Sequence, residues 1–270
     1  MRPKDSATEY GDRPDLQTGT APNVTRQLTE PRPDAGSGDF YICEFPKSGI
    51  TYLTVLLANL LLIANDYRAR ATFASVRNYI TDLCVAEQVK SHRFADPPIR
   101  LYKTHSVFSA QFIHSLYLVR HPVDVMASNL RYAIGRGWWD SENSDNFLDH
   151  PVLGLEAWKS HVNGWLVEHD FASDVIFIHL LRYEDLIANP ARELQNISDN
   201  FGWQLPTEAF AAAVAASTRE EMRAQEQRYR SFNPNHRFEF VSQAGSDLDA
   251  NSRARILASC QDELRLLGYT

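Results

Sequence analysis

The 270-residue sequence is poor in cysteine and in long apolar runs. Its three cysteines, Cys43, Cys84 and Cys260, are far apart and show no zinc-finger or redox spacing, so we expect reduced, mostly buried thiols. The longest apolar stretch, Leu53 to Ala64, is too short to span a bilayer, which takes about 20 residues. The N-terminal segment has no apolar run behind a basic start, so no secretory signal is predicted. These absences favour a cytoplasmic protein without a membrane partner.

Positive charge is also in short supply. Lys and Arg number 27 against 34 Asp and Glu, which gives a formal net charge of -7. A chain with this balance repels polyanions, which argues against nucleic acid as a partner. Any anion that this protein handles must therefore be met by a few locally placed cations.

The order of segments indicates an α/β protein. Residues 1–39 carry five of the thirteen prolines and few large aliphatic side chains, which predicts a disordered or loosely packed tail before one domain over residues 40–270. From there β-rich runs alternate with helical stretches, which predicts a central parallel sheet flanked by helices. The expected strands are Phe40–Phe45, Ile99–Lys103, Ser115–Arg120 and Val175–Arg182, and the expected helices are Thr51–Asp66, Val123–Tyr132, Leu153–His169 and Pro190–Phe201.

Basic or hydrogen-bonding residues follow each of the four expected strands. They are Lys47, Lys103 with His105, Arg120 with His121, and Arg182 with Tyr183. The carboxyl ends of parallel strands share one edge of a sheet, and ligands bind in the crevice there. The sequence therefore predicts an anion site at this edge.

The loop between the first strand and the first helix is the most informative segment. Phe45–Tyr52, with the sequence FPKSGITY, leads from a strand into an apolar helix, an arrangement that offers backbone N–H groups and a positive dipole end to a phosphate. Lys47 adds a full charge, and Ser48 and Thr51 add hydroxyl groups. It is not the loop of nucleoside triphosphatases, because that loop places its lysine after a glycine and this chain has no Gly-Lys pair.

Pro46–Tyr52 resembles the signature loop of the sulfotransferases that use PAPS, 3′-phosphoadenosine 5′-phosphosulfate. The resemblance implies that Lys47 contacts the 5′-phosphate and the bridging oxygen, with Ser48, Gly49 and Thr51 around it. Relatives usually have Thr-Thr-Trp where this chain has Ile50-Thr51-Tyr52. Tyr52 is still an aromatic plate on which adenine can stack.

Two further segments resemble the same family. Val119–Ser128 is similar to its second signature, which implies that Arg120 and Ser128 bind the 3′-phosphate. The types of residue suit this role, because a guanidinium engages two phosphate oxygens and a hydroxyl supplies another donor. Tyr102–His105 is similar to the segment that carries the family's general base, which implies that His105 removes the acceptor proton while Lys103 stabilises developing charge.

The later segments match less closely. Leu181–Leu186 resembles the family's Tyr-Glu-Asp segment, which implies that Tyr183 contacts adenine, and Ser217 with Thr218 aligns with a further cofactor segment. Arg219 stands where relatives have an aromatic residue. The C-terminal Arg-Lys-Gly clamp on the 3′-phosphate is missing from Arg237–Asp247. Arg228, Arg230 and Arg237 are candidates either to replace it or to form a solvated charged face opposite Glu220, Glu221 and Glu226.

The resemblance implies a P-loop-like sulfotransferase fold and transfer of the sulfuryl group of PAPS to a hydroxyl, or less favourably an amine, of a small molecule, with no metal. Two alternatives remain open: a kinase for nucleosides or small molecules, and a non-catalytic nucleotide-binding protein of the same fold. Trp138, Trp139 and Phe147 are candidates either for a loop over the acceptor or for packing inside the domain.

Overall fold

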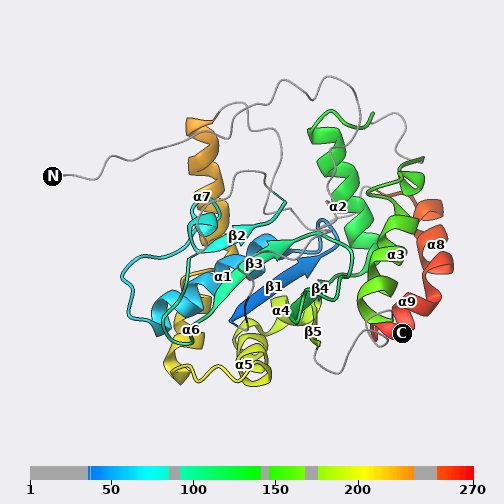
Figure 1. The fold of residues 1–270 in the computed structure, drawn as a ribbon. Coiled ribbons are helices and arrows are strands. Elements are labelled where there is room, and N and C mark those ends of the chain that lie inside the picture. The colour runs from blue at the N-terminus through cyan, green and yellow to red at the C-terminus, as the bar shows by residue number, and fades with distance from the viewer. Residues whose placement is uncertain (1–35, 37, 85–91, 141–145, 168–175, 234–247) are drawn as a thin grey trace.

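One sheet organises the described part of the chain, and every neighbouring pair of its strands runs parallel. The strand order is β2-β3-β1-β4-β5, so β1 lies at the centre (Figure 1). The strands are β1 (Asp39–Glu44), β2 (Ile80–Asp82), β3 (Arg100–Thr104), β4 (His114–Val119) and β5 (Phe177–Arg182). The computed structural model describes residues 36, 38–84, 92–140, 146–167, 176–233 and 248–270.

Helices cover both faces of the sheet. In Figure 1 α2, α3, α8 and α9 lie on one side, and α1, α5 and α6 lie on the other. The helices are α1 (Ile50–Ala64), the short 3-10 helix η2 (Val76–Asn78), α2 (Pro122–Gly135), α3 (Leu155–Leu166), α4 (Tyr183–Ala188), α5 (Pro190–Asn200), α6 (Thr207–Ala215), α7 (Arg219–Phe232), α8 (Ala250–Ser259) and α9 (Gln261–Leu266). No helix of the described residues is long and apolar enough to cross a membrane.

The central strand shows how the sequence produces two cores. Side chains alternate between the two faces of a strand. Phe40 and Ile42 of β1 enter the core that contains α1 and α6, whereas Tyr41 and Cys43 enter the core that contains α2 and α3. Both faces of β1 are therefore buried, which explains why its sequence is nearly continuously apolar.

Helix α1 is buried almost all round and joins the sheet to α6. Its one buried amide, Asn59, is fully bonded: Nδ2 donates to the carbonyl of Ala71 at 3.1 Å and to Oγ of Ser217 at 2.9 Å, and Oδ1 accepts from the Ala71 amide at 2.7 Å. A helix that is apolar on every side belongs in a core. The start of α1 is therefore held in place by the body of the domain.

The predicted fold class is confirmed, as are the four expected strands and the four expected helices, each with shifted ends. β2, η2, α4 and the helices after α5 were not predicted. Residue 175 and residues 168–169, which the sequence placed in a strand and a helix, lie outside the described residues, as does nearly all of the N-terminal tail. Cys43 and Cys260 are buried, Cys84 is half-buried, and all three are free.

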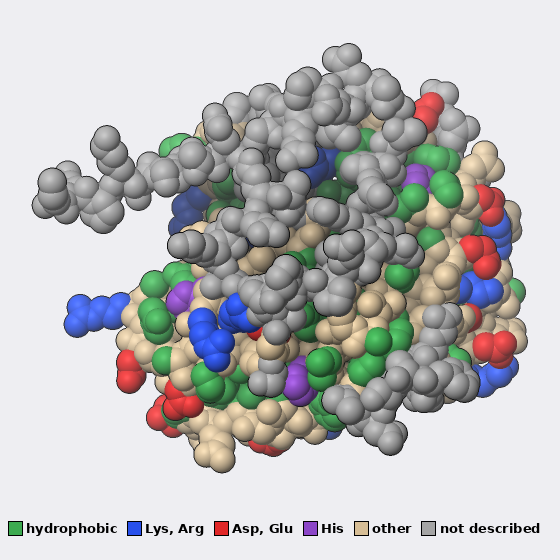
Figure 2. All heavy atoms as spheres, viewed as in Figure 1, with side chains coloured by type: hydrophobic (Ala, Val, Ile, Leu, Met, Phe, Trp, Pro, Cys, Tyr) green, Lys and Arg blue, Asp and Glu red, His purple; other side chains and the backbone are tan. Residues whose placement is uncertain are grey.

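The surface over α8 and α9 carries charges of both signs rather than a basic patch of the kind that binds polyanions (Figure 2). Figure 2 shows acidic and basic side chains interspersed over α8 and α9. One contributor is the ion pair between Arg255 of α8 and Asp149. This face therefore carries side chains of both signs.

Candidate functional site

The loop from β1 to α1 forms a tight cradle at the carboxyl end of the central strand. Lys47 has φ 75° and Gly49 has φ 117°, so two residues of this turn adopt the left-handed region. A Cβ atom on Gly49 would overlap the ring of Tyr183, so only glycine fits both the backbone and the space. Ser48 is buried, and its Oγ donates to the carbonyl of Phe45 at 2.9 Å. The cradle is thus closed by its own hydrogen bonds.

A cavity of about 160 Å3, open to solvent, lies against this loop. The strand ends contribute Lys103, His105, Arg120 and Tyr183, as the position of the sheet edge predicted. The candidate residues that line the cavity are Lys47, Gly49, Thr51, Tyr52, Lys103, His105, Arg120, Ser128 and Tyr183. The lining residues that the sequence analysis did not predict as site residues are Glu44, Pro46, Ile50, Tyr132, Arg219 and Met222.

Three of the candidates do not line the cavity. Ser48 supports the loop from beneath through its bond to Phe45. Ser217 is fully buried and bonds to Asn59. Thr218 is the N-cap of α7, where its Oγ1 accepts from the amide of Glu221 at 3.2 Å. Ser217 and Thr218 therefore place the first turn of α7, from which Arg219 and Met222 reach the cavity.

Two cations of the cavity have incomplete partners. Burial lowers the pKa of Lys47 to about 8, and its Nζ lies 4.7 Å from the centroid of the Tyr132 ring. Arg120 Nε is buried and finds no hydrogen-bond partner among the described residues. The guanidinium lies 4.8 Å from the ring centroid of Tyr183, and Nη1 is 3.5 Å from the carbonyl of Lys47. Arg120 is half-buried as a whole, and a bound anion would accept from its unsatisfied Nε.

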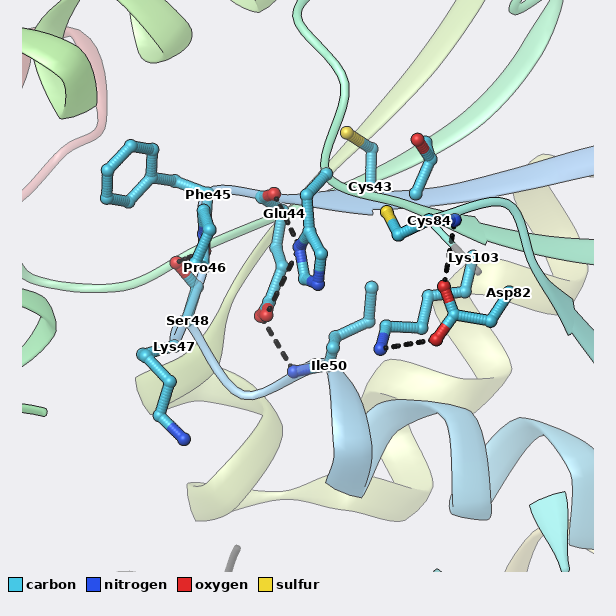
Figure 3. Close-up of polar contacts among 12 residues, drawn as sticks. Cys43, Glu44, Phe45, Pro46, Lys47, Ser48, Ile50, Asp82, Cys84 and Lys103 are labelled. Carbon is cyan, nitrogen blue, oxygen red and sulfur yellow. Dashed lines mark hydrogen bonds and ion pairs between the residues drawn. The ribbon is translucent and has the colours of Figure 1, made fainter. Parts of the chain in front are cut away.

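Lys103 is held differently. Its Nζ lies 3.2 Å from Oδ2 of Asp82 (Figure 3). The same oxygen forms an ion pair with Nη2 of Arg77 at 3.5 Å. Burial alone would lower the pKa of Lys103, but Asp82, followed by Cys84 and Glu44, outweighs burial and raises it. Lys103 therefore carries a permanent charge at the edge of the cavity, next to His105.

The hydrogen bond of His105 determines its tautomer. Nδ1 lies 3.2 Å from the backbone carbonyl of Glu44, and a carbonyl oxygen only accepts, so Nδ1 carries the proton. Nε2 then keeps its lone pair, on a side chain that lines the cavity. Burial, followed by the charge of Lys103, lowers the pKa of His105 to about 3, so the free site holds a neutral imidazole.

A buried hydrogen-bond network holds the turn that carries His105. The carbonyl of Ser106 accepts from Trp165 Nε1 at 3.1 Å, from His161 Nε2 at 3.1 Å and from the thiol of Cys43 at 3.4 Å. Because His161 Nε2 donates here, its Nδ1 accepts from the hydroxyl of Tyr117 at 2.9 Å. Helix α3 thereby fixes the backbone immediately after His105.

Glu44 is the acidic residue of the site, and the sequence analysis did not single it out. It is buried, lines the cavity, and its Oε2 accepts from the amide of Ile50 at 2.7 Å (Figure 3). Burial raises the pKa of Glu44 to about 7, against the opposing charge of Lys103. One sequence signal was available, since a carboxylate at the end of a strand that is buried throughout needs a partner.

The other candidates fall in three places. Arg228 pairs with Glu221 and Arg230 with Glu226 along α7, and the segment Arg237–Asp247 lies outside the described residues. Trp139 packs on buried Phe147 with ring centroids 5.5 Å apart. Trp138 packs on Tyr132 with ring centroids 5.4 Å apart. Phe147 and Trp139 thus join the core next to α2, and Trp138 supports a wall of the cavity.

Comparisons with known proteins agree with this geometry. The family model described as the sulfotransferase domain matches residues 37–244. The chain is 26% identical over 200 residues to rat sulfotransferase 1A1, covering 68% of this chain and 67% of the relative. It is also 26% identical over 208 residues to human sulfotransferase 2B1, covering 73% of this chain and 55% of the relative.

Solved structures share the fold. Retinol dehydratase in complex with androsterone and the inactive cofactor PAP superposes with a TM-score of 0.60 at 16% identity, covering 84% of this chain and 80% of that chain. Mouse sulfotransferase SULT7A1 complexed with PAP gives a TM-score of 0.57 at 17% identity, covering 86% and 85% of the two chains.

Proposed function

Because this chain belongs to the sulfotransferase domain family, we propose that it transfers the sulfuryl group of PAPS to a hydroxyl of a small-molecule acceptor, with His105 as the general base. One observation carries the proposal. The cavity brings Lys47, Lys103 and Arg120 together with a histidine whose Nε2 is free to accept a proton.

The donor set fits a nucleotide with two anionic ends. Lys47 and the start of α1 form the pocket for the 5′ end, and Arg120 with Ser128 forms the pocket for the 3′-phosphate. The unpaired Nε of Arg120 supports this assignment, because a phosphate oxygen would satisfy it. Tyr52 and Tyr183 supply aromatic faces for the adenine ring of the nucleotide, and Met222 lines the same cavity. When bound, PAPS supplies the sulfuryl group and a phosphate leaving group.

The residues of the chain then have separate tasks. His105 Nε2 takes the hydroxyl proton of the acceptor, and the Glu44 carbonyl keeps the ring in the required tautomer. Lys103, held by Asp82, and Lys47 stabilise the negative charge that moves toward the leaving phosphate. This chemistry depends on positioning and electrostatics, which a cradle fixed by buried hydrogen bonds provides.

A small organic acceptor is the substrate class that we propose. The solved neighbours include a protein crystallised with retinol and with androsterone, both of which carry a hydroxyl. The cavity beside His105 combines polar and aromatic walls, which suits a compact organic molecule.

The decisive experiment incubates the purified chain with 35S-labelled PAPS and a panel of phenols, alcohols, sugars and amines. We expect label transfer to at least one hydroxyl acceptor and binding of adenosine 3′,5′-bisphosphate, PAP, by calorimetry. His105→Ala should abolish turnover and leave PAP affinity nearly intact. Absence of both transfer and PAP binding, or transfer of phosphate from labelled ATP instead, would overturn the proposal.

A further inference from the structure

The carboxylate of Glu44 has no part in the mechanism so far, yet it lies beside the base. His105 Nδ1 is 3.8 Å from Glu44 Oε1 and 3.2 Å from the backbone carbonyl of the same residue. Both side chains are buried and both line the cavity. Glu44 therefore presents two oxygens to Nδ1, one from its carboxyl group and one from its backbone carbonyl.

We propose that Glu44 is a positioning residue for His105, whose carboxylate balances the imidazolium that forms when His105 takes the proton of the acceptor. The inference rests on the proposed function, in which His105 is the base. It adds a residue outside the segments that resembled the family, found from distances and burial alone.

The Glu44 carboxylate is held in place from its other side. Its Oε2 accepts from the amide of Ile50, the first residue of α1, at 2.7 Å (Figure 3). The N-terminus of a helix favours a negative charge, and Lys47 and Lys103 act in the same direction. Oε2 is thus bonded to the helix, and Oε1 lies 3.8 Å from His105 Nδ1.

Other charged groups around His105 are already engaged. Asp82 of β2 also raises the pKa of His105, but its carboxylate is paired with Lys103 and Arg77. His161 of α3 and Lys103 of β3 oppose a positive charge on the ring. Cys43 of β1, Cys84 and Tyr117 of β4 are neutral at neutral pH, because burial raises the pKa of each. Among the described residues the carboxylate nearest to Nδ1 that is not in an ion pair with a Lys or Arg side chain belongs to Glu44.

The two groups titrate in different pH ranges. Burial raises the pKa of Glu44 to about 7, while burial and then Lys103 lower the pKa of His105 to about 3. Near neutral pH the proton that the pair gains or loses therefore belongs to the Glu44 carboxyl. Above pH 7 the resting form is a carboxylate beside a neutral imidazole, which is the form that can take up the acceptor proton.

The proton balance of the step is then complete. The acceptor O–H proton moves to His105 Nε2, the acceptor oxygen bonds to sulfur, and the S–O bond to the 5′-phosphate breaks with its electron pair on the phosphate. The new imidazolium points its Nδ1–H at the Glu44 carbonyl and carboxylate. Without the Glu44 carboxylate, the imidazolium would form in a buried site whose charged neighbours are Lys103 and the Asp82 that is paired with it.

Glu44→Gln separates this role from simple support of the loop. Glutamine keeps an oxygen for the Ile50 amide but removes the negative charge. The matched control is Glu263→Gln, which makes the same change in another buried glutamate, in α9, whose Oε1 accepts from Nδ2 of Asn163 in α3 at 3.0 Å. A role confined to packing predicts equal consequences for the two variants.

The first readout needs no turnover. In the free protein, nitrogen-15 NMR of the histidine rings, with His105 assigned from His105→Gln, should show a protonated Nδ1 and a shift of the His105 signals with a midpoint near pH 7. Glu44→Gln should lose that midpoint, and Glu263→Gln should keep it. A His105 signal without a midpoint there in the wild type, or with the same midpoint in Glu44→Gln, overturns the proposal.

The second readout uses sulfuryl transfer. We expect kcat of the wild type to rise as the pH passes 7 and Glu44→Gln to lose this rise. The kcat of Glu44→Gln should be about 10- to 100-fold lower than that of the wild type, a smaller loss than the loss expected when the general base itself is removed. PAP affinity should not weaken, which separates kcat from binding. Wild-type kcat in Glu44→Gln would refute the role of Glu44 alone, whereas a wild type that shows the NMR coupling but neither transfer nor PAP binding would refute the proposed function alone.

Discussion

The guanidinium of Arg120 lies over the ring of Tyr183, 4.8 Å from its centroid, and the two residues follow neighbouring strands. Arg120 comes after β4, and Tyr183 begins α4 directly after β5. A cation over an aromatic face is restrained in orientation. This contact aligns the guanidinium before any anion binds.

Arg120→Met should weaken PAP binding by about 10- to 100-fold, because a charge-assisted hydrogen bond contributes about 1.5–3 kcal/mol. Isothermal titration calorimetry measures this loss. Arg255→Met is the control, since Arg255 of α8 pairs with Asp149 and does not line the cavity. Equal affinities of the two variants would contradict the assignment of Arg120 to the 3′-phosphate.

Gly49→Ala should destabilise the protein more than an alanine at another left-handed glycine. At Gly49 the new Cβ meets both an unfavourable φ of 117° and the ring of Tyr183, whereas at Gly202 φ is 67° and no atom lies within 4 Å. Strain alone costs about 1–2 kcal/mol. Denaturant unfolding should therefore show a clearly larger loss for Gly49→Ala, together with lost PAP binding. A loss no greater than that of Gly202→Ala would show that Tyr183 moves aside.

PAP affinity should fall as the pH rises from about 6 to about 9. Protonated Lys47 attracts the bound phosphates, and ionised Glu44 repels them. Burial places the pKa of Lys47 at about 8 and that of Glu44 at about 7. A bound anion raises both pKa values, so the protein takes up protons when PAP binds. Calorimetry in buffers of different ionisation enthalpy measures the uptake. An affinity that increases over this pH range would reverse the expected sign.

His161→Phe should lower kcat and thermal stability without weakening PAP binding. The substitution removes one donor from the Ser106 carbonyl and leaves the buried hydroxyl of Tyr117 without its acceptor, at a cost of about 1–3 kcal/mol. His179→Phe is the control, because His179 is buried on β5 and bonds to Asn200 rather than to the turn of His105. Loss of PAP binding in His161→Phe alone would place the network under the cofactor pocket instead.

The fold was predictable where strands are buried on both faces. Such strands produce long apolar runs, as in β1 and β4, and the helices between them are amphipathic or wholly apolar. β2 is three residues long, too short for any alternation to show. α4 begins directly after β5 without a break, and α7 is strongly polar, so neither has the usual signals.

The candidate site was predictable for residues that lie next to strand ends, but not for those brought in by tertiary contact. Lys47, Lys103 and Arg120 all line the cavity, as the shared sheet edge requires. Ser217 was predicted from a motif, yet its side chain turns inward to Asn59. Met222 reaches the cavity only because α7 folds back over the sheet edge. The direction of a side chain and its distant neighbours are not local properties of sequence.

The contrast between α1 and α7 indicates where this protein can be re-engineered. α1 has eleven buried residues and shares its core with the sheet, so substitutions there lower the free energy of unfolding. α7 has only Met222 and Glu226 buried, yet its first turn supplies Arg219 and Met222 to the cavity. A library directed at α7 would therefore sample new ligand preferences on a helix that the core hardly constrains, while the anion cradle stays intact.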